Sequence, residues 1–233
     1  MYSELEKNAI YRVIAERRDM RHFINKSVDP EILTKIFNAA NQAPSVGLMQ
    51  PWRFVRITNS DIRKDIYTLV DKERVLTAKA LNKREDEFMK LKVEGILECG
   101  ELIVVALPNE REQHIFGRRT MPQMDLASTS CAIQNMWLAA RAEGIGMGWV
   151  SIFEPNELSS LLNMPEGSEA IAILCIGHVD KFYDEPMLIS EKWTSKTDIE
   201  NLVFENSWLN SEQLDSYNAN TNVESETETE IND

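Results

Sequence analysis

The sequence predicts an α+β fold in which helices flank a mainly antiparallel central sheet. Residues 101–108 ("ELIVVALP") and 170–179 ("AIAILCIGHV") are continuous apolar runs of the kind found in strands buried on both faces. Helical and strand patterns follow one another without the regular βαβ repeat that a parallel sheet needs. With 233 residues, of which 43% are hydrophobic, the chain is also long enough to bury one large core.

Two helices and a strand are the first elements expected along the chain. Apolar side chains recur at helical spacing over residues 3–16. A second helix is expected to begin after Asp29, a candidate N-cap, with Pro30 at its first position, and to end at Pro44. Residues 52–57 ("WRFVRI") are then predicted to form a strand because they are rich in aromatic and β-branched side chains.

The central part of the chain is predicted to hold the longest helices. A charged helical region is expected over about residues 60–97, before the first buried strand. The strongest helical pattern covers residues 125–144 and ends at Gly144, as helices often do. Through "IGMG" it leads into a predicted strand at residues 149–153 ("WVSIF"), and a short helix at residues 154–163 precedes the second buried strand.

The composition changes near Asn210, where the chain becomes polar and acidic. Such a segment cannot bury enough apolar surface to offset the entropy lost on ordering. We therefore expect one domain over residues 1–209 and an acidic disordered tail over residues 210–233. As an alternative function, a non-catalytic scaffold module would use this tail to recruit a partner, although charge runs of this kind are usually solvated chain ends.

The net charge of −13 argues against nucleic acid or an anionic membrane as a partner, because both need a broad basic surface. The sequence has no apolar run near the roughly 20 residues that span a bilayer, and its polar N-terminus lacks the apolar segment of a signal peptide. A cytoplasmic protein without a membrane partner is therefore expected.

The cysteines and histidines do not form the patterns of a disulfide framework or a metal site. Cys99, Cys131 and Cys175 are odd in number, widely spaced and set in apolar surroundings, so we expect buried thiols. The three histidines are scattered and lack the spacing of metal ligands. No metal is predicted.

The stretch "ERRDMRHF" concentrates charge at the expected end of the first helix. Arg17, Arg18 and Arg21 fall within five residues, so they could hold a phosphate through several charge-assisted hydrogen bonds. Alternatively, they are cations that stabilise the helix dipole at its C-terminus. Asp19 lies among them, and its carboxylate is unexpected in a site built to hold an anion.

Two loops could approach a ligand. In "APSVGLMQPW", Ser45 and Gln50 could offer hydrogen-bonding groups to a flat heterocycle, or the loop could be an ordinary connection between helix and strand. In "GIGMGW", the glycines follow a helix and precede a strand, whereas a dinucleotide-binding loop needs the reverse order. A Rossmann site is therefore rejected, and the glycines are expected to allow a tight turn or a close backbone approach.

Four motifs, "RRDMRHF", "APSVGLMQPWRFV", "CAIQNMWLAARAEGIGMGWVSI" and "CIGHVD", occur in this order within about residues 7–205. Together they resemble the FMN-binding nitroreductase superfamily and, within it, the 5,6-dimethylbenzimidazole synthases. The resemblance implies a nitroreductase-like sandwich and an FMN-binding domain.

The resemblance also implies an activity, the oxygen-dependent fragmentation of reduced FMN. The products would be 5,6-dimethylbenzimidazole, which is the lower ligand of cobalamin, and erythrose 4-phosphate. FMN would be a substrate and dioxygen a co-substrate, while NAD(P)H would act only indirectly, through a partner flavin reductase. The alternative is a conventional NAD(P)H-dependent, FMN-containing nitroreductase or flavin reductase, which shares the fold.

The resemblance assigns roles to individual residues. Ordinary nitroreductases commonly have serine at the position of Asp19, whereas the synthases have a catalytic aspartate there, which can transfer protons. Ser151, in "GWVSI", is the second catalytic candidate; otherwise it is a strand serine bonded to the backbone. The residues expected to bind the flavin are Arg17, Arg18, Arg21, Ser45, Gln50, Leu107, Gly148, Trp149 and Lys196, the last at a position where the family has arginine.

Nitroreductase-fold proteins are generally homodimers with the flavin at the subunit interface, so the resemblance implies a homodimer. The apolar helix around Ile133, Met136, Trp137 and Leu138 is a candidate for that interface. An apolar stripe of this kind is more often part of the core of a single chain.

Overall fold

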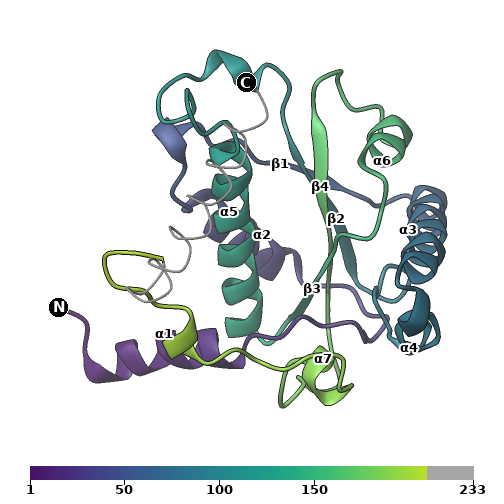
Figure 1. Ribbon diagram of the computed structural model, residues 1–233, viewed down its shortest axis with the longest axis horizontal. Coiled ribbons are helices and arrows are strands. Elements are labelled where there is room, and N and C mark those ends of the chain that lie inside the picture. The colour runs from purple at the N-terminus through teal and green to yellow at the C-terminus, as the bar shows by residue number, and fades with distance from the viewer. Residues whose placement is uncertain (209–233) are drawn as a thin grey trace, which may run out of the picture. The chain divides into compact units, whose positions relative to one another are not determined.

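The computed structural model describes residues 1–208 and divides the chain into two compact units, Met1–Glu191 and Lys192–Asp233 (Figure 1). In the described part of the second unit, Ile199–Asn201 form a single 3-10 turn, and the rings of Phe204 and Trp208 stack at 5.1 Å. The acidic tail predicted from residue 210 lies outside the described residues, so that tail and its boundary stay predictions.

Within the described residues, the first unit is built around one sheet with the strand order β1-β2-β4-β3. The strands are β1 (Arg53–Arg56), β2 (Glu101–Leu107), β3 (Gly146–Val150) and β4 (Glu169–Gly177). Every neighbouring pair is antiparallel, which confirms the predicted α+β fold. The two apolar runs form β2 and β4 at the centre of the sheet, and every residue of β2 is buried.

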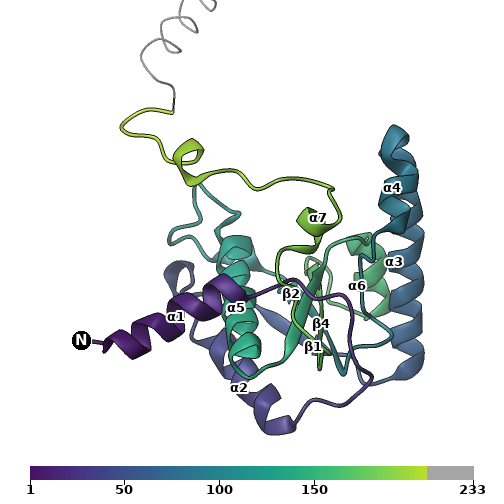
Figure 2. The ribbon, with the colours of Figure 1, turned by 90° about the horizontal axis from the view of Figure 1, so that it is seen from below.

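Helices cover both faces of this sheet (Figure 1 and Figure 2). Helices α2 (Pro30–Asn41) and α5 (Met124–Ala142) pack on one face, and α3 (Ser60–Ala80) and α6 (Pro155–Leu161) pack on the other. The remaining helices are α1 (Glu4–Glu16), α4 (Glu85–Lys90) and α7 (Met187–Ser190). None of the helices within residues 1–208 is both long enough and apolar enough to cross a membrane.

Two predicted boundaries are wrong. The helical region expected to reach residue 97 stops at Ala80, where Asn82 takes a left-handed φ of 49° that asparagine tolerates, and α4 adds only a short segment. The strand expected at residues 149–153 instead begins at Gly146 and ends at Val150, so the "GMG" expected in a loop belongs to β3.

Helix α5 forms as predicted, and Gly144 follows it with a φ of 73°. Of the four residues proposed for an interface on this helix, Ile133 and Met136 are fully buried in the core of the single chain. Trp137 and Leu138 are half-buried, and their contact with a second chain stays a prediction. Cys99 and Cys175 are buried as predicted, but Cys131 is exposed on α5.

Candidate functional site

Strand β3 lies at an edge of the sheet, and the chain from Asp19 to Arg21 takes the place of a further strand beside it. Asp19 forms a parallel bridge with Met147, and the Met20 N–H donates to the Met147 carbonyl at 3.0 Å. Side chains then replace the main chain: Trp149 N–H donates to Asp19 Oδ1 at 2.9 Å, and Arg21 Nη2 donates to the Trp149 carbonyl at 2.8 Å. Asp19 and Arg21 thus satisfy backbone groups that an open edge would leave unpaired.

Asp19 and Arg21 also form an ion pair, in which Arg21 Nη2 lies 2.5 Å from Asp19 Oδ2. Arg21 is 8% exposed, whereas the Asp19 side chain keeps 42% of its surface exposed. Burial by the surrounding protein raises the pKa of Asp19, and this effect outweighs the opposing effects of Arg21, the Trp149 N–H and Arg17. Asp19 is therefore a reachable carboxyl group with a raised pKa, which is typical of residues that exchange protons.

Residues 17–21 are called the arginine segment below. The three arginines of this segment have different partners. Arg18 donates from Nη1 to the carbonyls of Ala15 and Arg17, at 2.7 and 2.8 Å, and from Nη2 to the Asp184 carbonyl at 2.8 Å. Arg18 thus binds carbonyls at the end of α1, as the alternative of a cation at the helix terminus expects, and its contact with a phosphate stays a prediction. The Arg17 side chain lies 4.7 Å from the Trp137 ring centre and has no hydrogen bond or ion pair within residues 1–208. Arg17 therefore retains its donors for an anion.

Trp137 holds the arginine segment against the fold. Its Nε1 lies within hydrogen-bond distance of two carbonyls, that of Arg18 at 3.0 Å and that of Met147 at 2.9 Å. The same indole therefore joins α5 to both the arginine segment and β3. The sequence interpretation treated Trp137 only as a candidate interface residue and missed this role, because its two partners come from distant parts of the chain.

Gly148 allows the arginine segment to approach β3. A Cβ atom at this position would lie 2.1 Å from the Met20 carbonyl oxygen and 2.7 Å from Arg21 Nη1. The sequence predicted a close backbone approach to a ligand or a tight turn at these glycines, whereas the group that approaches Gly148 in the structure is the protein's own chain. Contact of Gly148 or Trp149 with a flavin stays a prediction.

Ser151 follows β3 directly and is exposed. It lies two residues after Trp149, whose N–H binds Asp19, so the two catalytic candidates belong to the same end of β3. The Ser151 hydroxyl has no hydrogen-bond partner in the described part of the chain, so the alternative of a strand serine bonded to the backbone is not supported. Its donor and acceptor are available to a ligand.

The loop that carries Ser45 and Gln50 lies apart from Asp19 within one chain. Ser45 Oγ accepts from the Gln50 N–H at 3.0 Å, and the Val46 N–H donates to Ser128 Oγ in the first half of α5. From Ser128 to Trp137, which contacts the arginine segment, α5 rises about 14 Å. A single chain therefore does not bring this loop to the arginine segment.

Two further predicted residues have no demonstrated role at the site. Leu107, at the end of β2, is only 2% exposed, so its side chain faces the protein interior. Lys196 is exposed in the second unit, and its contact with a phosphate stays a prediction. No group of three or more His, Cys, Asp or Glu side chains within residues 1–208 is arranged to hold a metal ion.

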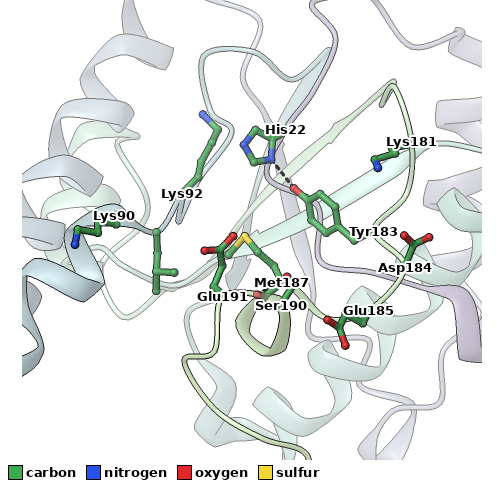
Figure 3. A pocket seen from close by; sticks show the side chains of 11 residues that line it. His22, Lys90, Lys92, Lys181, Tyr183, Asp184, Glu185, Met187, Ser190 and Glu191 are labelled. Atoms are coloured by element: carbon green, nitrogen blue, oxygen red, sulfur yellow. Dashed lines mark hydrogen bonds between the residues drawn. The ribbon is translucent and has the colours of Figure 1, made fainter.

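A pocket of about 400 Å³ adjoins the arginine segment (Figure 3). His22, Tyr183 and Asp184 are among its lining residues, whereas Asp19 and Ser151 are not. We place the candidate active site at Asp19 rather than in this pocket, because Asp19 combines a reachable carboxyl, a raised pKa and neighbouring cations.

Residues 14–178 match the nitroreductase family. A 5,6-dimethylbenzimidazole synthase of Rhodospirillum rubrum is 38% identical over 77% of this chain and 86% of its own length. A second protein of that name, from Rhodobacter capsulatus, is 31% identical over 82% of this chain and 94% of its own. These relatives confirm the resemblance carried by the four motifs.

The solved structure of the NADPH:FMN oxidoreductase from Vibrio harveyi has the same fold, with a TM-score of 0.65 at 19% identity over 93% of this chain and 86% of its own. The predicted nitroreductase-like sandwich is therefore confirmed. Sequence match and fold agree, and this chain belongs to the nitroreductase family of enzymes.

Proposed function

We propose that this enzyme uses dioxygen to fragment reduced FMN into 5,6-dimethylbenzimidazole and erythrose 4-phosphate. The observation that carries the proposal is the Asp19 carboxyl, which is reachable, has a raised pKa and is held among arginines. A phosphate-binding segment needs no acid, but a reaction with several proton transfers does. Two relatives named 5,6-dimethylbenzimidazole synthase support this choice over other members of the family.

The residues present fit the phosphate of FMN. Arg17 keeps all its donors, and two buried arginine nitrogens, Arg18 Nε and Arg21 Nη1, have no hydrogen-bond partner within residues 1–208. Unpaired buried donors are costly, and an anion in the segment would lower that cost by adding charge-assisted hydrogen bonds. When bound, reduced FMN would supply the electrons that dioxygen accepts and the carbon atoms of both products.

The protein's own contribution is proton transfer and orientation. The raised pKa keeps the Asp19 carboxyl protonated to a higher pH than an exposed aspartate, so it can deliver a proton and later recover one. Arg21 and the Trp149 N–H hold one carboxyl oxygen each and fix the direction of the group. The Ser151 hydroxyl can donate to an oxygen or accept from a nitrogen at the same end of β3.

We infer that a second copy of the chain completes the site. Ser45 and Gln50 lie far from Asp19 within one chain, so in a homodimer the partner's loop would meet the flavin. Leu48 and Phe116, which are 79% and 84% exposed, lie on and beside this loop, as an interface would require. Light scattering should give the mass of two chains, and Phe116→Glu should lower both that mass and the activity. A fully active monomer would refute this inference.

The function is tested by mixing the protein with chemically reduced FMN, admitting air and analysing the products by chromatography and mass spectrometry. The expected product is 5,6-dimethylbenzimidazole, absent without protein and with Asp19→Asn. Return of intact oxidised FMN, with binding of reduced FMN confirmed, would overturn the proposal and favour an NAD(P)H-dependent nitroreductase. A flavin reductase is the proposed natural source of reduced FMN, and adding one with NADPH should replace the chemical reductant.

A further inference from the structure

Tyr183 and Asp184 contact the arginine segment, and Phe182, which precedes them, contacts Arg141 of α5. The hydroxyl of Tyr183 accepts from the Arg21 N–H at 3.2 Å, and the Asp184 carbonyl accepts from Arg18. The Phe182 ring lies 4.1 Å from the guanidinium carbon of Arg141, whose Nη2 is 2.5 Å from Glu16. These contacts come from a part of the chain that has no role in the proposed chemistry.

His22 fixes the orientation of the Tyr183 hydroxyl. The distance between His22 Nδ1 and Tyr183 Oη is 2.7 Å, and Figure 3 shows the two side chains meeting at the edge of the pocket. The phenol oxygen accepts from the Arg21 N–H, and the phenol proton can donate to Nδ1 in the tautomer that carries its hydrogen on Nε2. Tyr183 is thus held at a single hydrogen-bonding position between His22 and the main chain of Arg21.

Arg21 is therefore fixed at both ends. Tyr183 binds its main chain, while its guanidinium binds Asp19 and the Trp149 carbonyl. The positive charge of Arg21 is the largest influence that lowers the pKa of Asp19 against the rise caused by burial. If Arg21 moves away from Asp19, less of that rise is offset.

We propose that Tyr183 is a positioning residue that holds Arg21 against the Asp19 carboxyl, and that His22 orients Tyr183 for this role. Tyr183 acts through Arg21 and does not itself contact the reacting atoms. The proposal rests on the proposed function only where catalysis is measured, because the placement of Arg21 beside Asp19 can be observed in the protein without flavin.

Charged groups lie around Asp19 and around the Tyr183–His22 pair. Arg17 and Arg21 face Asp19. The charged groups that line the pocket around Tyr183 and His22 are Lys90, Lys92, Lys181, Asp184, Glu185 and Glu191. All of them remain in each variant below, so their effect on a titration is common to wild type and variant, and the difference isolates the altered contact.

The test is a carbon-13 NMR titration of the Asp19 carboxyl, assigned from the signal that disappears in Asp19→Asn. Tyr183→Phe removes the hydroxyl, and the pKa of Asp19 should rise by about half a unit or more, the equivalent of one hydrogen bond. Tyr67→Phe is the matched control, because Tyr67 packs against an apolar cluster on the other face of the sheet and its hydroxyl has no hydrogen bond in the described residues. Equal pKa values in wild type and Tyr183→Phe would overturn the proposal.

Variants of His22 test the same proposal independently, because they do not require Tyr183→Phe to fold. His22 is exposed, so His22→Ala should fold, and it should raise the pKa of Asp19 in the same direction but by less. His22→Asn places an amide oxygen where Nδ1 accepts and should return the pKa toward that of wild type. An unchanged pKa in His22→Ala would refute the role of His22.

Catalysis provides the second readout. In Tyr183→Phe the limb of the pH profile on which 5,6-dimethylbenzimidazole formation falls with rising pH should move to higher pH by the same amount as the NMR titration. If the wild-type protein makes no product but the pKa of Asp19 still differs between wild type and Tyr183→Phe, the proposed function is refuted and the role of Tyr183 stands. Product formation in which neither this limb nor the NMR titration moves in Tyr183→Phe would refute the role of Tyr183 and leave the proposed function intact.

Discussion

Gly148→Ala should destabilise the protein because the added Cβ would collide with the arginine segment. The comparison with Gly146→Ala separates this collision from the cost of any added methyl group on β3. The added Cβ would lie 2.1 Å from the Met20 carbonyl oxygen, so the segment would have to move by more than about 1 Å to reach ordinary contact. Overpacking against backbone costs about 1–3 kcal/mol. Losing the hydrogen bonds of Asp19 and Arg21 to Trp149 adds about 1 kcal/mol each. The free energy of unfolding should therefore fall by about 3–5 kcal/mol.

Gly146→Ala is the matched control on the same strand. Its Cβ would come closest to a methyl group of Val179, at 2.4 Å, which can rotate away, while its nearest backbone atom is 3.3 Å distant. Its free energy of unfolding should stay within about 1 kcal/mol of wild type. Urea denaturation measures both variants, and product formation should fall roughly 100-fold in Gly148→Ala alone, as for a catalytic group displaced by 1 Å. Equal stability and activity of the two variants would refute the packing argument.

Asp19→Asn should bind reduced FMN within about threefold of wild type, since one carboxyl is exchanged for an amide of similar size, and should form no 5,6-dimethylbenzimidazole; product at a near-normal rate would show that Asp19 transfers no proton. In the wild-type protein, burial raises the pKa of Asp19, so the fall in activity as Asp19 loses its proton should lie above the range of an exposed aspartate, and a fall at the ordinary aspartate pKa would contradict this. Arg17→Ala should weaken binding of reduced FMN by about tenfold or more in a fluorescence titration, whereas Arg17→Lys should restore part of it. Ser151→Ala should lower the rate of product formation by about 10- to 100-fold with little change in binding, and an unchanged rate would exclude the hydroxyl.

The sequence by itself determined the elements and the family. Apolar runs identified β2 and β4 as buried central strands, and Asp29 with Pro30 marked the start of α2, because these signals depend on residues close together in the chain. Spacing did not locate the C-terminal end of α3 or the start of β3, where the left-handed Asn82 and packing against the arginine segment decide the boundary. The motifs around Asp19 and Ser151 were enough to indicate the enzyme family, which the comparisons confirm.

Only the tertiary structure decided which partner each of the three arginines binds. The sequence treats three arginines as one phosphate-binding group. In the fold Arg18 binds carbonyls at the helix end and Arg21 binds Asp19, each with one nitrogen left unpaired, whereas Arg17 retains all its donors within residues 1–208. Each partnership depends on residues distant in the chain: Trp149 lies 130 positions from Asp19, and Tyr183 lies 162 positions from Arg21. Local patterns record propensity and periodicity, whereas the pKa of a carboxyl and the freedom of a guanidinium depend on neighbours that only folding brings together.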